Sequence, residues 1–265
     1  MENLKALTEA VCCVAREAGH FLKEERKSFR REVVQEKHAH DYVSYVDKAS
    51  EKKVVSALRK LLPEAGFIAE EGSAAYSDET YCWVVDPLDG TTNYIHDNAP
   101  YCVSIALRDK QSLLLGVVYE PCRDECFYAW KGGGAYVNGE RLRVSLVSEP
   151  KDAFVVTELP YNFEQYARTG EHLIHELYGK VAGIRMNGSA ALALCYVAAG
   201  RFDAWLEAFI GKWDFSAAAL MVLEAGGKAT DFLGNENFIE GHHIIATNGP
   251  LHPLFLRLVR EALPF

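Results

Sequence analysis

Five short runs of β-prone residues follow one another between residues 66 and 130, and no other feature constrains the fold of this chain as strongly. Two further β-like runs, at 154–157 and 243–247, come later. The series predicts a chain built on sheets, with helices before, between and after the strands. The five early runs cover 66–69, 82–85, 102–107, 113–119 and 125–130, and glycine and Asn-Gly turns punctuate the residues after them.

Helical patterns flank these runs on both sides. Apolar residues recur at helical spacing in 3–28, and a second helix is expected at about 48–61, with Asp47 at its N-cap. By the same criteria, further helices are expected at about 190–199, 215–225 and 252–262. Helices mixed with short strands in this way favour an α+β or α/β domain.

The segment 26–40 between the first two helices is charged and aperiodic, which predicts a surface loop. We interpret its His38 and His40 as solvated residues rather than metal ligands. His242 and His243 precede an apolar strand and point to alternate faces of it, so we assign them no metal either.

Composition narrows the class of protein. The net charge is −9, and nucleic-acid-binding domains usually carry the opposite balance, so no nucleic acid is expected as a partner. No apolar run reaches the length of a membrane span and the early helix is amphipathic, so we expect neither a membrane partner nor a secretory signal.

The seven cysteines lack the spacing of zinc ribbons or redox motifs, and we interpret them as reduced, mostly buried thiols of a cytoplasmic protein. The 265 residues fit one body whose halves, 1–145 and 146–265, pack together.

Three acidic sites lie at the edges of predicted elements: Glu70-Glu71, the pair Asp86 and Asp89, and Asp214. Each alone has an ordinary interpretation, as a solvated edge, a turn around Pro87 and a helix N-cap respectively. Asp86 and Asp89, three residues apart on this turn, can converge on one point and supply oxygen ligands of the kind that Mg²⁺ prefers.

The residues that follow Asp86 add to this chemistry. The carbonyl group of Leu88 is presented between the two aspartates, and Gly90-Thr91-Thr92 can begin a helix. The free backbone N–H groups of that helix start would face the same point and hold a phosphate group. One short segment therefore offers metal ligands, an anion cradle and two hydroxyl groups.

The order of these motifs resembles the inositol monophosphatase family. The motifs are Glu-Glu-Gly at 70–72, Trp-Val-Val-Asp-Pro-Leu-Asp-Gly-Thr-Thr-Asn at 83–93, and Trp-Asp-Phe-Ser-Ala-Ala at 213–218, with Asp47 closing an earlier motif at 41–47. The resemblance extends over nearly the whole chain. It implies an α+β fold layered as an αβαβα sandwich, of the type shared with fructose-1,6-bisphosphatases, and usually a homodimer.

The resemblance also implies roles for individual residues. Two to three Mg²⁺ ions would be held by Glu70, Asp86, the carbonyl oxygen of Leu88, Asp89 and Asp214. Thr91, supported by Asp47, would orient the attacking water together with Glu70, and that water would displace the leaving group directly and in line. The carboxylate of Glu207 would accept hydroxyl groups of the polyol. Substrate-binding positions would be Asp89, Gly90, Thr91, Gly188, Ser189, Ala190, Glu207 and Asp214.

The expected function is Mg²⁺-dependent hydrolysis of inositol monophosphate to inositol and phosphate, with a small phosphorylated polyol as partner. The sequence Gly-Thr-Thr-Asn after Asp89 favours the inositol branch over the related phosphatases of the superfamily. A fructose-1,6-bisphosphatase, an NADP phosphatase and a 3′,5′-bisphosphate nucleotidase remain alternatives, and a non-catalytic phosphate-binding regulator is a more remote one. The family is lithium-sensitive, although Lys37 and the His-Ala-His at 38–40 replace the small residues more usual beside its third metal.

Overall fold

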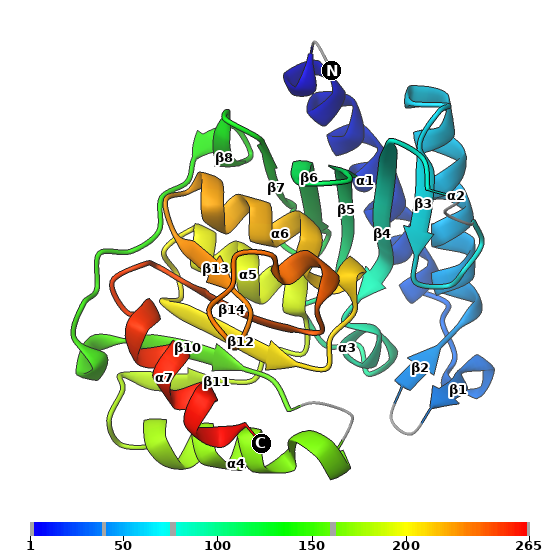
Figure 1. Ribbon diagram of the computed structural model, residues 1–265. Helices are drawn as coiled ribbons and strands as arrows, with labels where there is room; N and C mark the ends of the chain where they lie inside the picture. The colour runs from blue at the N-terminus through cyan, green and yellow to red at the C-terminus, as the bar shows by residue number, and fades with distance from the viewer. Residues whose placement is uncertain (1–2, 39–40, 75–77, 160–162, 264–265) are drawn as a thin grey trace.

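The computed structural model describes residues 3–38, 41–74, 78–159 and 163–263, and its helices and sheets stack as alternating layers (Figure 1). The first sheet has seven strands. In spatial order they are β3 (Gly66–Ala69), β4 (Tyr81–Asp89), β5 (Cys102–Asp109), β6 (Leu113–Glu120), β7 (Glu125–Trp130), β8 (Gly134–Val137) and β9 (Glu140–Arg141). β3 and β4 run parallel, and every later neighbouring pair is antiparallel. All five β-prone runs between residues 66 and 130 are therefore strands of one sheet.

The second sheet has five strands. In spatial order they are β11 (Gly183–Arg185), β10 (Phe154–Thr157), β12 (Ala204–Ala208), β14 (His243–Thr247) and β13 (Lys228–Thr230). β10 is parallel to both of its neighbours, whereas β14 is antiparallel to both of its own. The predictions for β10 and β14 are confirmed. β11 and β13 were not predicted, because three residues are too few to establish an alternating pattern.

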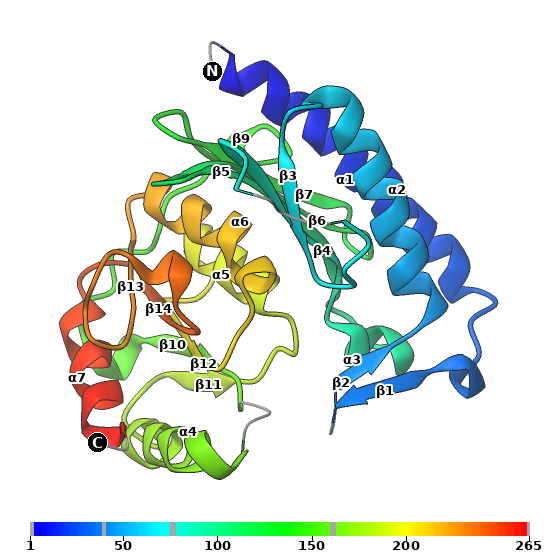
Figure 2. The same ribbon diagram turned by 45° about the vertical axis from the view of Figure 1, so that its right-hand side comes forward.

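Helices form the other layers (Figure 2). α1 (Leu4–Arg26) and α2 (Tyr45–Leu61) cover the outer face of the first sheet, and α5 (Ala190–Ala198) and α6 (Lys212–Glu224) separate the two sheets. The outer face of the second sheet is covered by α4 (Phe163–Leu177) and α7 (His252–Ala262). This order of layers confirms the predicted α+β fold, an αβαβα sandwich.

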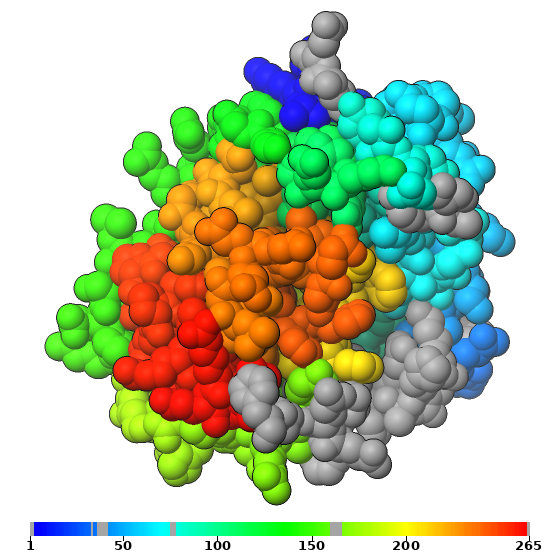
Figure 3. Space-filling model, in the orientation of Figure 1, coloured from blue at the N-terminus to red at the C-terminus, as the bar shows by residue number. Residues whose placement is uncertain are grey.

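Three hydrophobic clusters fill the spaces between the layers. All nine residues of α5 are buried, because a helix between two sheets has no face left for water. α1, in contrast, buries a single stripe that includes Val11, Ala15 and Leu22. In the space-filling view, the orange segment that follows α6 borders green residues of the first sheet on the face toward the viewer (Figure 3).

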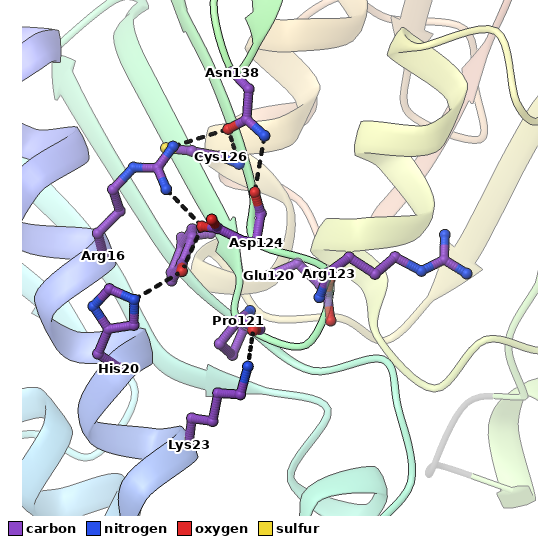
Figure 4. A network of polar contacts seen from close by, with 10 residues as sticks. Arg16, His20, Lys23, Glu120, Pro121, Arg123, Asp124, Cys126 and Asn138 are labelled. Atoms are coloured by element: carbon purple, nitrogen blue, oxygen red, sulfur yellow. Dashed lines mark hydrogen bonds and ion pairs between the residues drawn. The ribbon is translucent and has the colours of Figure 1, made fainter.

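Polar contacts attach α1 to the turn between β6 and β7 (Figure 4). The Arg16 guanidinium donates to Asp124 Oδ1 at 2.7 Å and to Asn138 Oδ1 at 2.8 Å. The Tyr119 hydroxyl also donates to Asp124, at 2.9 Å, and Lys23 Nζ donates to the carbonyl of Pro121 at 3.2 Å. The bonds from Arg16 and Lys23 therefore attach α1 to this edge of the first sheet.

One local prediction is wrong, and one helix was not predicted. The expected loop at 26–40 contains β1 (Gln35–His38), which pairs with β2 (Asp41–Val43) as an antiparallel hairpin. His38 therefore lies on a strand, and His40 lies outside the described residues. α4 was not predicted, although its buried apolar residues Tyr166, Leu173 and Leu177 recur at helical spacing, so the signal for this helix was present in the sequence.

The cysteines are free thiols. Cys82, Cys102, Cys126 and Cys195 are buried, whereas Cys13 and Cys122 are exposed. Within the described ranges, no helix combines the length and the apolar character that a bilayer span requires.

Candidate active site

A pocket of about 490 Å³ opens between the first sheet and the end of β12, and it gathers the predicted site residues. Every one of them except Asp47 lines the pocket. Those lining residues are Glu70, Asp86, Leu88, Asp89, Gly90, Thr91, Gly188, Ser189, Ala190, Glu207 and Asp214. They come from segments more than a hundred residues apart in the sequence, so the tertiary fold assembles the site.

Asp86, Asp89 and Asp214 form an acidic cluster in which one carboxylate oxygen of each lies within 4.8 Å of the others. The predicted turn around Pro87 is wrong, because the segment is part of a strand. β4 continues through Asp89, and its register against β5 shifts between Asp86, opposite Ser104, and Asp89. Continued pairing with β5 keeps the segment extended, and the irregularity turns both carboxylates toward one point.

Hydrogen bonds orient each carboxylate of the cluster. Asp86 Oδ1 accepts from the N–H of Leu88 at 2.9 Å. Asp89 Oδ2 accepts from the Ser189 hydroxyl and from the N–H of Ala191 at 3.0 Å, at the start of α5. A carboxylate is favoured at a helix N-terminus by the exposed N–H groups there. Because Oδ2 is engaged, Asp89 has Oδ1 left for another ligand.

Asp47 and Asp214 share a local geometry that the sequence analysis assigned wrongly. Neither is an N-cap, since each occupies the third helical position and accepts from the backbone N–H of the true N-cap. Ser44 donates to Asp47 Oδ2 at 2.9 Å, and Gly211 donates to Asp214 Oδ2 at 2.8 Å. The capping is reciprocal at α2, where the Ser44 hydroxyl accepts from the N–H of Val46, and one-way at α6, where Gly211 has no side chain. Both carboxylates are thereby held at helix starts.

Burial raises the pKa of all three aspartates in the cluster. For Asp86 the next causes are the charges of Glu70, Asp89 and Asp214, in that order. For Asp214 they are the charges of Asp89 and Glu70, and its carboxyl group also hydrogen-bonds Asp86. Protons or cations must offset this concentrated charge. A donor set made only of oxygen atoms fits Mg²⁺.

Thr91 connects the pocket to the buried Asp47. Its hydroxyl lies 3.2 Å from Asp47 Oδ1 and 2.9 Å from the carbonyl oxygen of Leu88. Asp47 is fully buried, and burial raises its pKa, although hydrogen bonds from Ser44 oppose that shift. The raised pKa makes Asp47 a better proton acceptor than an exposed aspartate.

Two residues of α2 that the sequence analysis did not select hold the site segments in place. The Ser50 hydroxyl donates to the carbonyl of Pro87 at 3.0 Å. The buried Glu51 carboxylate accepts from the N–H groups of Glu71 and Ser73, both at 2.7 Å. Ser50 and Glu51 lie three and four residues after Asp47, so they share its helix face. That spacing was the available signal.

The loop before α5 is held from both sides of the pocket. Asn93 on α3 (Thr91–Ile95) donates to the carbonyl oxygens of Pro100 at 2.8 Å and Asn187 at 3.0 Å. Glu158 accepts from the N–H groups of Asn187 and Gly188, at 2.5 and 2.8 Å. Neither Asn93 nor Glu158 was predicted as a positioning residue, because the loop residues Asn187 and Gly188 that they bind lie far along the chain.

Gly90 cannot be replaced without strain. Its φ is +87°, and an added Cβ would lie 3.0 Å from the carbonyl oxygen of Pro100 and 3.1 Å from that of Gly188. Glycine is therefore required for the close approach of α3 to these two loops.

Glu207 on β12 has a polar atom without a partner. Within the described part of the chain, its Oε2 is buried and accepts no hydrogen bond. Burial raises the pKa of Glu207 well above its usual value, and the charges of Glu158, Asp214 and Asp89 add to that effect. Buried polar atoms are normally hydrogen-bonded, so this oxygen is suited to a donor on a bound molecule.

The two late histidines make hydrogen bonds within the protein. His242 Nδ1 lies 3.2 Å from the carbonyl oxygen of Ile210, and His243 Nε2 lies 3.2 Å from the Tyr166 hydroxyl. Burial lowers the pKa of His243, which keeps its ring neutral near pH 7. Both rings therefore support the wall of the pocket that follows β12.

A model of the inositol monophosphatase family matches residues 3–263. The chain is 45% identical over 240 residues to the Nus factor SuhB of Pseudomonas aeruginosa, a match that covers 87% of each protein. It is 39% identical over 235 residues to the inositol-1-monophosphatase of Caulobacter vibrioides, covering 86% of this chain and 91% of that one. It also resembles the crystal structure of the extragenic suppressor protein SuhB from Bartonella henselae, with a TM-score of 0.91 and 35% identity over 98% of this chain and 100% of that chain.

Proposed function

The chain belongs to the inositol monophosphatase family, and we propose that it hydrolyses inositol monophosphate to inositol and phosphate in a Mg²⁺-dependent reaction. One observation carries the proposal. The pocket that contains the Asp86–Asp89–Asp214 cluster also contains the unpartnered oxygen of Glu207. The cluster suits a metal and a phosphate group, and Glu207 suits the hydroxyl groups of a polyol.

Two to three Mg²⁺ ions would be held by Glu70, Asp86, the Leu88 carbonyl, Asp89 and Asp214. When bound, Mg²⁺ would lower the pKa of coordinated water and offset the negative charge of the phosphate group. The backbone N–H groups of Gly90 and Thr91 would bind the phosphate oxygens. Gly188, Ser189 and Ala190 would line the other side of the substrate, with Ser189 also keeping Asp89 in place.

Thr91 and Asp47 offer a route for the proton of the attacking water. The Thr91 hydroxyl can donate to Asp47 Oδ1 while one of its lone pairs accepts a hydrogen bond from water. A proton leaving the water can then pass to Thr91 Oγ1 as the Thr91 proton moves to Asp47. Water attacks phosphorus directly in this scheme as the bond from phosphorus to the polyol oxygen breaks, and that oxygen leaves as a hydroxyl group after taking a proton from solvent. No residue of the chain is phosphorylated.

The related phosphatases differ from this proposal only in the leaving group. A fructose-1,6-bisphosphatase, an NADP phosphatase or a 3′,5′-bisphosphate nucleotidase would use the same acidic cluster. Phosphate release from inositol 1-phosphate, fructose 1,6-bisphosphate, NADP and adenosine 3′,5′-bisphosphate, with Mg²⁺ and with EDTA, separates these candidates. We expect a preference for inositol 1-phosphate and no activity in EDTA.

The variant Glu207→Gln sharpens this test. It should raise KM for inositol 1-phosphate about 10-fold or more, because one of the two side-chain oxygens that could accept from the polyol hydroxyls is replaced by an NH₂ group that cannot accept. Glu149→Gln, at an exposed carboxylate outside the pocket, is the matched control and should behave as wild type. Preference for another panel substrate would retain the metal chemistry and reject the polyol assignment.

The similarity to the Nus factor SuhB of Pseudomonas aeruginosa favours a second candidate function, that of a Nus factor. The two functions are compatible, since one protein can carry both. The test is complementation of Pseudomonas cells that lack their own protein, using a folded variant of this chain that has no phosphatase activity. If that variant restores growth, the second function belongs to this chain and does not depend on phosphatase activity. Four expectations from the sequence stay predictions: that the protein has no nucleic-acid partner, that it forms a homodimer, that its two halves divide at residue 145, and that it is cytoplasmic.

A further inference from the structure

Phe209 has a backbone conformation that its side chain disfavours. Its φ is +58°, in the left-handed region. Bulky residues rarely adopt this region, whereas Asn and Asp tolerate it. Within the described ranges, the other non-glycine residues with positive φ are of those tolerant types, namely Asp78, Asp97, Asp124 and Asn138. Phe209 is the exception, and its conformation costs free energy that something must offset.

Burial of the ring does not offset this cost in full. The Phe209 side chain is 49% exposed, and it lines the pocket two residues after Glu207. Its ring is supported from behind by Tyr166 and His242, with centroid distances of 6.2 and 6.5 Å. An aromatic ring that is half exposed at the mouth of a pocket offers a surface for a ligand.

The backbone around Phe209 is anchored in this position. The N–H of Phe209 points to His243 Nδ1 at 3.5 Å, and the N–H of Ile210 donates to the carbonyl of His242 at 3.1 Å. Leu159, 52% exposed, also lines the pocket. The pocket therefore has an acidic floor and an apolar, partly aromatic mouth.

We propose that the Phe209 ring packs on the C–H face of a ring-shaped alcohol while Glu207 receives its hydroxyl groups, so that Phe209 selects phosphate esters of cyclic polyols over those of open-chain polyols. This inference rests on the proposed phosphatase activity. A six-membered polyol presents a flat C–H face, which suits the electron-rich face of an aromatic ring. An open-chain polyol has no such face and loses more conformational freedom on binding.

The test is the ratio of kcat/KM for inositol 1-phosphate to kcat/KM for glycerol 2-phosphate. Both values come from one preparation, so the ratio is independent of the fraction of folded protein. In Phe209→Gly the ratio should fall about 10-fold, the scale of one lost apolar contact in a pocket. Glycine adopts positive φ without strain, so the Tm of this variant should be unchanged or higher.

Two further variants complete the design. Phe209→Trp keeps an aromatic ring and should keep the ratio. Leu233→Gly removes an exposed apolar side chain (52% exposed) that does not line the pocket, and it should leave the ratio at the wild-type value.

The outcomes are distinct. An unchanged ratio in Phe209→Gly, with both substrates still hydrolysed, overturns the inference and leaves the proposed function intact. A lower Tm with an unchanged ratio also overturns it and makes Phe209 a structural residue. If the wild-type protein releases phosphate from neither substrate, the proposed function fails and this inference fails with it.

Discussion

Replacing Asp214 by asparagine should stabilise the protein in EDTA and abolish its response to Mg²⁺. Asparagine has nearly the same shape, and its side-chain oxygen can still accept from the N–H of Gly211, which lies 2.8 Å from Asp214 Oδ2. The substitution therefore removes one negative charge from the cluster with Asp86 and Asp89 and leaves the start of α6 capped.

The distances in the cluster set the size of the effect. Two full negative charges 4.8 Å apart repel by about 3.5 kcal/mol at an effective dielectric constant of about 20. The raised pKa values of the three aspartates mean that protons already neutralise part of this charge, so the expected gain is about 1–2 kcal/mol. For a chain of this size, that corresponds to an increase in Tm of roughly 2–8 °C.

The effect has a definite dependence on pH. A carboxyl group whose pKa is raised in the folded state stabilises the protein at low pH, and that contribution is lost as pH rises through the folded-state pKa. The gain from Asp214→Asn should therefore be larger at pH 8 than at pH 5. Stabilisation of the wild-type protein by Mg²⁺ should also be larger at pH 8 than at pH 5, because at low pH the metal must displace protons from the carboxyl groups.

Thermal unfolding followed by circular dichroism, at both pH values and with EDTA or Mg²⁺, measures these shifts. Turnover of the variant should fall at least about 100-fold, because a metal-ligand charge is lost. Asp152→Asn, at an exposed aspartate outside the pocket, is the control and should change neither Tm nor turnover. A lower Tm for Asp214→Asn in EDTA, or a Mg²⁺ shift equal to that of the wild type, would refute the reasoning.

Two further predictions concern Thr91 and His252. Thr91→Val should lower kcat about 100-fold or more, because the hydroxyl that links water to Asp47 is lost. Thr91→Ser keeps a hydroxyl, so its kcat should stay within about 10-fold of the wild-type value. Equal kcat values in the two variants would contradict the proton route. Burial lowers the pKa of His252 to about 4, so the unfolded chain takes up a proton on His252 at a higher pH than the folded protein does. The contribution of neutral His252 to the free energy of unfolding should therefore be fully present above about pH 6.5 and should be lost, by up to about 3 kcal/mol, as pH drops to about 4. Urea titrations at several pH values measure this loss. His252→Asn should reduce the dependence of the unfolding free energy on pH.

The sequence alone determined the class of fold and the main acidic residues. Apolar periodicity is a local property, so it was sufficient to predict the helices near 3–28 and 252–262 and the five strands of the first sheet. The spacing of Asp86 and Asp89 predicted an oxygen-rich site, the resemblance to the family added Asp214, and the structure brings all three together.

Only the tertiary structure decided how these residues are held. The extension of β4 through Asp89 depends on pairing with β5, and the roles of Ser50 and Glu51 depend on which segments lie against α2. The strained conformation of Phe209 is equally invisible in the sequence. These features arise from hydrogen bonds and packing between residues far apart along the chain. Local propensity carries no information about such partners, because their identity is set only when the layers are stacked.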